Sequence, residues 1–158
     1  MRSGVRLAFD VGKARVGVAR CDCDAILAVP VQTMARDRYG ADIDEAADLV
    51  TDHDAIEVVV GLPRPLRGGS SASTKDARRW AADLATTVSV PVRLVDERLT
   101  TVTAHRALHD AGLRARDFRP VVDQAAAVAI LEQALAIERQ TGQPPGELVP
   151  NTQRGRRQ

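Results

Sequence analysis

Two short apolar segments near the start of the chain are so close together that they can pair only as an antiparallel hairpin. Residues 5–9 (VRLAF) and 16–21 (VGVARC) are joined by the six residues DVGKAR. A parallel pair needs a crossover connection of about a dozen residues or more. A third apolar segment, Ile26 to Thr33, follows closely, and Pro30 predicts an irregularity within it. The spacing therefore predicts a three-stranded antiparallel meander.

After the meander, the hydrophobic period changes from that of strands to that of helices. Ile43, Ala46, Ala47 and Val50 follow helical spacing and predict a helix over about 41–53. The β-branched run AIEVVVGLP, residues 55–63, predicts a buried strand with a parallel neighbour. Further expected elements are a helix over 74–88 that begins with a capping box of Ser73 and Asp76, a fifth strand within 90–101, and helices over 101–111 and 122–139.

This order of elements predicts one α/β domain over residues 1–141. Three antiparallel strands followed by βαβ crossovers give a mixed five-stranded sheet flanked by helices, which is the layout of the ribonuclease H-like fold. Residues 142–158 are rich in proline, glycine and arginine, and we expect them to be a disordered tail. No apolar run approaches the roughly 20 residues of a membrane span, and the first residues lack a signal-peptide pattern. We therefore expect a cytoplasmic protein.

Acidic residues stand where the expected elements begin or end. Asp10 ends the first strand, Asp96 and Glu97 end the fifth, and Asp123 begins the last helix. Ligands of open α/β sheets gather outside the carboxyl ends of parallel strands, so Asp10 and Glu97 could reach one edge. Considered alone, Asp10 could also cap a turn, and Asp123 could also complement a positive helix N-terminus.

Three converging carboxylates would repel one another unless a cation lies between them. Ligand sets made only of oxygen favour Mg²⁺ or Mn²⁺, and such ions serve phosphoryl chemistry. In this reading Asp10 anchors the metal, and Gly12 and Gly17 let the hairpin bend and a phosphate approach. As ordinary hairpin glycines, the same two residues would have no such role.

Four segments in this order resemble the YqgF/RuvX family. They are Asp10-Val11-Gly12 with Arg15, Gly17 and Ala19; Gly61-Leu62-Pro63; Asp96-Glu97-Arg98-Leu99-Thr100-Thr101; and Asp123-Gln124-Ala125-Ala126-Ala127 with Ile130-Leu131. The resemblance runs from about Leu7 to Ala136. It implies a ribonuclease H-like nuclease, related to Holliday junction resolvases, that matures the 5′ end of pre-16S rRNA.

The resemblance also implies roles for particular residues. Asp10, Glu97 and Asp123 would be the catalytic acids that bind Mg²⁺ or Mn²⁺. Arg15 and Arg98 would be clamps for a phosphate or carboxylate, or else structural ion-pair partners. Independently of the resemblance, Gly12 in the hairpin and Arg64 and Arg67 in the Gly/Ser-rich loop complete the expected substrate-binding set; as a plain connector, that loop would have no such role. Expected partners are pre-rRNA or branched DNA, with a ribosomal particle and a second copy of the chain as further candidates.

The chain departs from the resolvases in two places. Resolvases of this fold usually carry their middle acid at the end of the fourth strand, where this chain has Gly61-Leu62-Pro63. Glu97 would have to replace that acid from the next strand. Resolvases also tend to have a fourth acid on the last helix, near the position where this chain has Ala126 and Ala127.

Two other functions compete with the nuclease. A strand ending in Asp-x-Gly also opens the actin-like kinases, but those need a second domain for which this chain is too short. The other alternative is a nucleic-acid-binding factor in ribosome maturation or transcription that does not cleave. The chain has a net charge of +1 and 3% aromatic residues, so such a factor would bind nucleic acid through local phosphate contacts rather than base stacking. RNA and branched DNA present the same phosphodiester, so the sequence leaves the substrate open.

Overall fold

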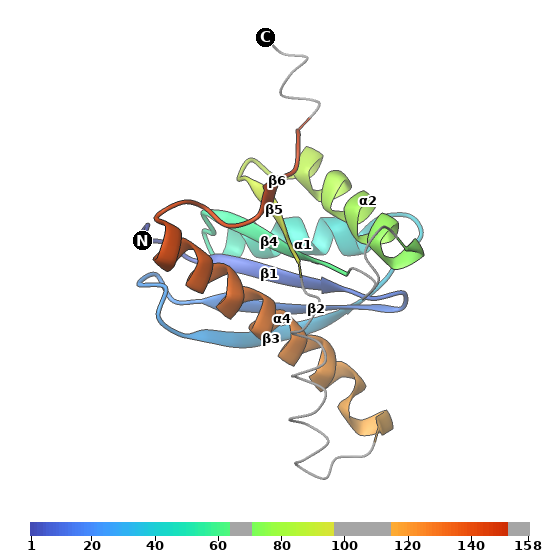
Figure 1. Ribbon diagram of the computed structural model, residues 1–158. Helices are drawn as coiled ribbons and strands as arrows, with labels where there is room; N and C mark the ends of the chain where they lie inside the picture. Colours follow the sequence, from blue (N-terminus) through green and yellow to red (C-terminus); the bar gives the residue numbers. More distant parts are fainter. Residues whose placement is uncertain (64–70, 97–114, 152–158) are drawn as a thin grey trace.

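The computed structural model describes residues 1–63, 71–96 and 115–151, which form a six-stranded mixed sheet (Figure 1). Its strand order is β3-β2-β1-β4-β5-β6. The first three strands are antiparallel, β4 and β5 continue the sheet in parallel with β1, and β6 is antiparallel to β5. The bounds are Arg6–Val11 (β1), Arg15–Cys21 (β2), Ala28–Ala35 (β3), Glu57–Leu62 (β4), Val92–Asp96 (β5) and Glu147–Leu148 (β6). The expected meander and crossovers are confirmed, and the pairing of β2 with β3 shifts register where Ala19 meets Pro30.

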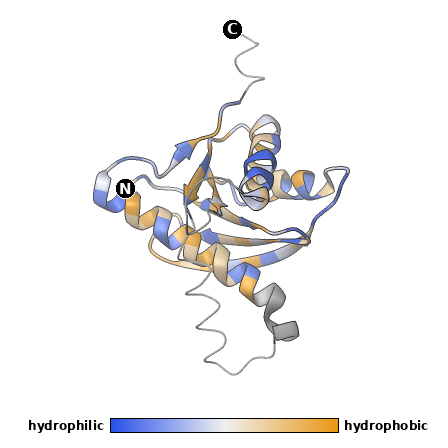
Figure 2. Cartoon of the chain, turned by 45° about the vertical axis from the view of Figure 1, so that its right-hand side comes forward, coloured by the Kyte–Doolittle hydropathy of each residue, from blue (hydrophilic) through white to orange (hydrophobic). Residues whose placement is uncertain are grey.

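Helices cover both faces of this sheet. Helices α1 (Ala41–Asp52) and α2 (Ala72–Thr87) lie on one face, and α4 (Ala115–Thr141) crosses the other face (Figure 1). The strands between them are largely hydrophobic (Figure 2). The helix expected over 101–111 lies outside the described residues. Among the helices that are described, none is long and apolar enough to cross a membrane.

Small side chains let α4 pack closely on the sheet. Ala126, Ala127 and Ile130 are fully buried, and Ala127 and Ile130 contact a core that includes Ala8 of β1 and Val59 of β4. Ala126 and Ala127, which follow Asp123 along the helix, are therefore packing residues. The helix begins at Ala115, seven positions before the expected start at residue 122.

The described sheet has six strands rather than the expected five. Residues 147–148, which we expected to lie in a disordered tail, form β6 at the edge of the sheet. The Val149 amide donates to the Val92 carbonyl at 2.8 Å, and Val149 is buried. Gly146 has a φ of +69°, and a Cβ there would lie 2.1 Å from the Leu94 carbonyl oxygen. Backbone pairing orders this segment, and composition carries no information about such pairing. Residues 152–158 lie outside the described residues.

The start of α2 also differs from the expectation. Ser71, rather than Ser73, is the N-cap, and its side chain accepts a hydrogen bond from the Thr74 amide at 3.2 Å. Asp76 cannot close a capping box, because with Ser71 as N-cap the third helical position is Thr74; the Asp76 carboxylate is instead paired with Arg36. The helix begins two residues earlier than the spacing suggested, and this shift leaves Asp76 outside the cap.

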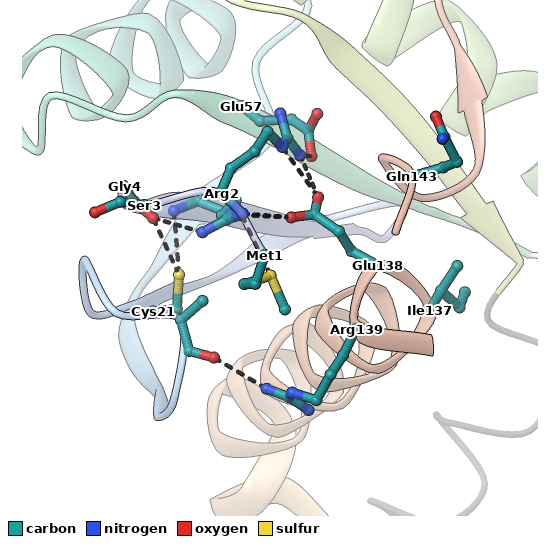
Figure 3. A network of polar contacts seen from close by, with 12 residues as sticks. Met1, Arg2, Ser3, Gly4, Cys21, Glu57, Ile137, Glu138, Arg139 and Gln143 are labelled. Carbon is teal, nitrogen blue, oxygen red and sulfur yellow. Dashed lines mark hydrogen bonds and ion pairs between the residues drawn. The ribbon is translucent and has the colours of Figure 1, made fainter. Parts of the chain in front are cut away.

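A buried ionic network anchors the C-terminal half of α4. Figure 3 shows the Glu138 side chain leaving α4 toward Arg2. Arg6, which is 1% exposed, donates to Glu138 at 2.8 Å, and Arg2 donates to both Glu138 and Glu57. Arg93 of β5 donates to Glu57 at 3.0 Å. Buried carboxylates are costly unless they are paired in this way, so the network ties α4 to three strands.

This network predicts a stability that depends on pH. Burial raises the pKa of Glu138, but the hydrogen bonds and charges of Arg2 and Arg6 outweigh burial and hold the pKa below its usual 4.5. Ionised Glu138 therefore contributes stability above about pH 4.5, and this contribution is lost as the pH falls through the lowered pKa. We expect Glu138→Gln to cost about 2 kcal/mol in urea unfolding at about pH 7 and clearly less at about pH 3. An equal cost at both pH values would contradict this role.

Candidate active site

Strand β1 places Asp10 on the face of the sheet that α4 covers. Side chains alternate along a strand, and Phe9 and Val11 are buried in the core beneath α1 and α2. Ala8 packs in the core beneath α4, so Asp10, two positions later, lies on the same side. Asp10 is partly exposed and stands near the carboxyl end of β1. This carboxylate is therefore accessible beside the N-terminal half of α4.

Gly17 brings Asp123 to the same place. Gly17 is the Cα partner of Asp10 across the β1–β2 ladder. A Cβ at Gly17 would lie 2.0 Å from the Asp123 carbonyl oxygen and 2.2 Å from its carbonyl carbon, so only glycine permits this approach. The space that we expected Gly17 to leave for a phosphate is instead filled by the backbone of α4. Asp10 and Asp123 therefore both adjoin Gly17 on one face of the sheet.

Arg15 pairs with Asp123 in this structure. The Arg15 Nε atom lies 2.8 Å from Asp123 Oδ2, with side-chain exposures of 35% and 17%. Of the two roles left open for Arg15, the ion-pair role is the one that the structure displays. The pair joins the start of β2 to α4, across 108 positions of sequence.

Gly12 forms the tight end of the β1–β2 hairpin. Its amide donates to the Arg15 carbonyl at 2.8 Å, and a Cβ at Gly12 would lie 2.9 Å from that carbonyl oxygen. The absence of a side chain thus keeps the turn narrow. Whether a phosphate contacts this turn stays a prediction.

The remaining expected site residues, Glu97, Arg98, Arg64 and Arg67, lie outside the described residues. Asp96, directly before Glu97, ends β5 at the edge where β1 and β4 also end, because the three strands are parallel. Within the described ranges, no three metal-ligating side chains gather. The two carboxylates around Gly17 supply only oxygen donors, so this donor set fits a hard divalent cation such as Mg²⁺ or Mn²⁺.

The sequence did not indicate a role for Arg36, which hydrogen-bonds to the turn of the β1–β2 hairpin. Its Nη1 donates to the Gly12 carbonyl at 2.7 Å, and its two Nη atoms bind both carboxylate oxygens of Asp76. These hydrogen bonds lower the pKa of Asp76. Asp42 receives Arg36 Nε at 3.3 Å and a hydrogen bond from Trp80 at 2.9 Å. Arg36 therefore links the Gly12 turn to the first turn of α1 and to Asp76 of α2, and nothing in its local sequence predicts these partners.

A family model described as "RuvX: Holliday junction resolvase" matches residues 4–137 of the chain. The chain belongs to the RuvX family. The resemblance noted from four short segments is thereby confirmed over most of the chain.

Curated relatives of this RuvX protein are similar over nearly their whole length. A protein of Clavibacter michiganensis subsp. michiganensis is 52% identical over 151 residues, which cover 95% of this chain and 94% of the relative. A Streptomyces coelicolor protein is 53% identical over 150 residues, covering 94% and 90%. Both carry the name "Putative pre-16S rRNA nuclease".

A solved structure with the same fold is that of Thermus thermophilus RuvC, described as "in complex with Holliday junction substrate". It has a TM-score of 0.61 and 17% identity, and the match covers 91% of this RuvX chain and 99% of the RuvC chain. This likeness confirms the expected ribonuclease H-like fold class.

Proposed function

We propose that this RuvX protein is a metal-dependent endonuclease that hydrolyses phosphodiester bonds of structured nucleic acid during 5′-end maturation of pre-16S rRNA. The observation that carries the proposal is that Asp10 and Asp123 both adjoin Gly17 on one face of a ribonuclease H-like sheet, Asp10 as its cross-strand partner and Asp123 through its backbone. The names of the relatives support the reaction class and the substrate. The family description favours a second substrate, the four-way DNA junction.

The chemistry requires a cation, because adjacent carboxylates repel one another and also repel phosphate. Asp10 and Asp123, with Glu97 as the third acid, would hold Mg²⁺ or Mn²⁺. When bound, such a cation activates water and offsets charge on the scissile phosphate. Asp123 is held in position by the contact of its backbone with Gly17. Arg98, Arg64 and Arg67 would contact substrate phosphates. A ribosomal particle as partner, a homodimer and a cytoplasmic location stay predictions from the sequence.

The deciding experiment is a cleavage assay on two substrates. Wild-type protein is incubated with end-labelled RNA that contains the 5′ flank of 16S rRNA, and separately with a four-way DNA junction. Each reaction contains Mg²⁺, Mn²⁺ or EDTA. We expect discrete cleavage of the RNA that EDTA abolishes. Binding without cleavage in every condition would favour the non-catalytic factor, and cleavage of the junction alone would make branched DNA the substrate.

The proposed metal site predicts that Mn²⁺ stabilises the fold. Ligand at about ten times its Kd stabilises by about 1.4 kcal/mol, which raises the Tm of a protein of this size by about 3–6 °C. Asp123→Asn should reduce this rise. Asp52→Asn serves as the matched control, because Asp52 is exposed at the end of α1 on the other face of the sheet. A wild-type Tm that does not respond to millimolar Mn²⁺ would contradict the metal site.

A further inference from the structure

The Arg15–Asp123 pair places a cation on the carboxylate that the proposed function assigns to the metal. The pair is well formed, with Nε and Oδ2 2.8 Å apart, yet the Arg15 side chain is 35% exposed. A guanidinium and a divalent cation seek the same carboxylate oxygens. Arg15 and the metal therefore compete for Asp123.

The two partners differ in their freedom to move. Asp123 is fixed by its backbone, because α4 packs directly against Gly17 and small buried residues follow Asp123 along the helix. Arg15 begins β2, and its long, partly exposed side chain can reorient without disturbing the core. When Asp123 takes another cation, the guanidinium is therefore the partner that leaves.

We propose that Arg15 neutralises Asp123 in the metal-free protein, and that binding of a divalent cation releases its guanidinium to contact a phosphate of the nucleic acid. This inference rests on the proposed function and adds a coupling between the metal and the substrate. While Arg15 is paired, Asp123 offsets its charge and occupies its Nε atom, so Arg15 attracts phosphate more strongly after it leaves Asp123, and metal therefore strengthens substrate binding. By linkage, bound nucleic acid strengthens metal binding by the same factor.

The first test measures Mn²⁺ binding by titration calorimetry without nucleic acid. Removal of the competing guanidinium in Arg15→Gln should tighten Mn²⁺ binding about three- to tenfold, the factor expected for a partly screened ion pair. Arg20→Gln is the matched control. It removes the same charge from the same strand, but Arg20 pairs with Leu7, whose side chain faces α1 and α2. Wild-type affinity for Mn²⁺ in Arg15→Gln, or no Mn²⁺ binding by either protein, would overturn the inference.

The second test separates a released Arg15 from a static positive charge near the site. In EDTA, Arg15→Gln should bind the labelled RNA within about twofold of wild type, because Arg15 is then held by Asp123. In Mn²⁺, the KM of Arg15→Gln for cleavage of the RNA should be several-fold higher than that of wild type. A static charge would instead weaken RNA binding equally in EDTA, and that result would overturn the inference. If Arg15→Gln binds Mn²⁺ more tightly than wild type but the wild-type protein cleaves neither substrate, the nuclease proposal fails while the competition at Asp123 stands.

Discussion

Asp10→Asn is expected to lower the rate of cleavage at least about a thousandfold, which corresponds to about 4 kcal/mol of lost transition-state stabilisation. The amide is nearly isosteric with the carboxylate but carries no charge. Asp10 pairs with Gly17 through the backbone of β1, and the substitution leaves that ladder intact. The loss should therefore arise from a weakened metal site rather than from unfolding.

Single-turnover cleavage measures this effect, with urea unfolding as the check on the fold. Asp52→Asn, which removes a carboxylate at the end of α1, should cleave at the wild-type rate. Binding of RNA in EDTA by Asp10→Asn should be unchanged or slightly tighter, because one carboxylate fewer repels the phosphates. If Asp10→Asn cleaves as fast as wild type, Asp10 is a turn residue with no part in the chemistry.

Gly17→Ala is expected to destabilise the protein by about 3 kcal/mol or more and to abolish most cleavage. The added Cβ would lie 2.0 Å and 2.2 Å from two backbone atoms of Asp123, and no side-chain rotation can relieve contacts with backbone. Either β2 or α4 must shift, and both shifts separate Asp123 from Asp10. The sign of the stability change is informative, because without this contact alanine would stabilise the interior of a strand relative to glycine by about 0.5–1 kcal/mol.

Urea unfolding and the cleavage assay measure the two effects of Gly17→Ala. The matched control is Gly40→Ala at the N-cap of α1, where a Cβ would meet nothing within 4 Å. Gly40 has a φ of +88°, so alanine there should cost about 1 kcal/mol through backbone strain alone and leave cleavage unchanged. A Gly17→Ala protein as stable and active as wild type would show that α4 does not depend on this contact.

Hydrophobic period and connection length determined most of the fold. The short connection after Phe9 required an antiparallel hairpin, and the spacing of Ile43 and Val50 predicted α1 to within one residue at its C-terminal end. The β-branched run before Gly61 predicted a buried strand with a parallel neighbour, and β4 has two, β1 and β5. These features succeed because they depend on residues a few positions apart, and local backbone geometry repeats over those distances.

Only the tertiary structure decided which residues meet. The sequence singled out Asp10 and Asp123 as acids at the ends of elements. It did not indicate that Gly17 is the contact that brings them together. Arg36 and Glu138 carry no local motif, and their partners come from other strands and helices. The short β6 was missed because its order comes from the exposed edge of β5 rather than from its own composition. Periodicity along the chain reports which face of an element is buried, whereas an ion pair or a close backbone approach depends on how distant elements pack. The sequence alone therefore determined most of the fold, and the tertiary structure determined which residues of the site come together.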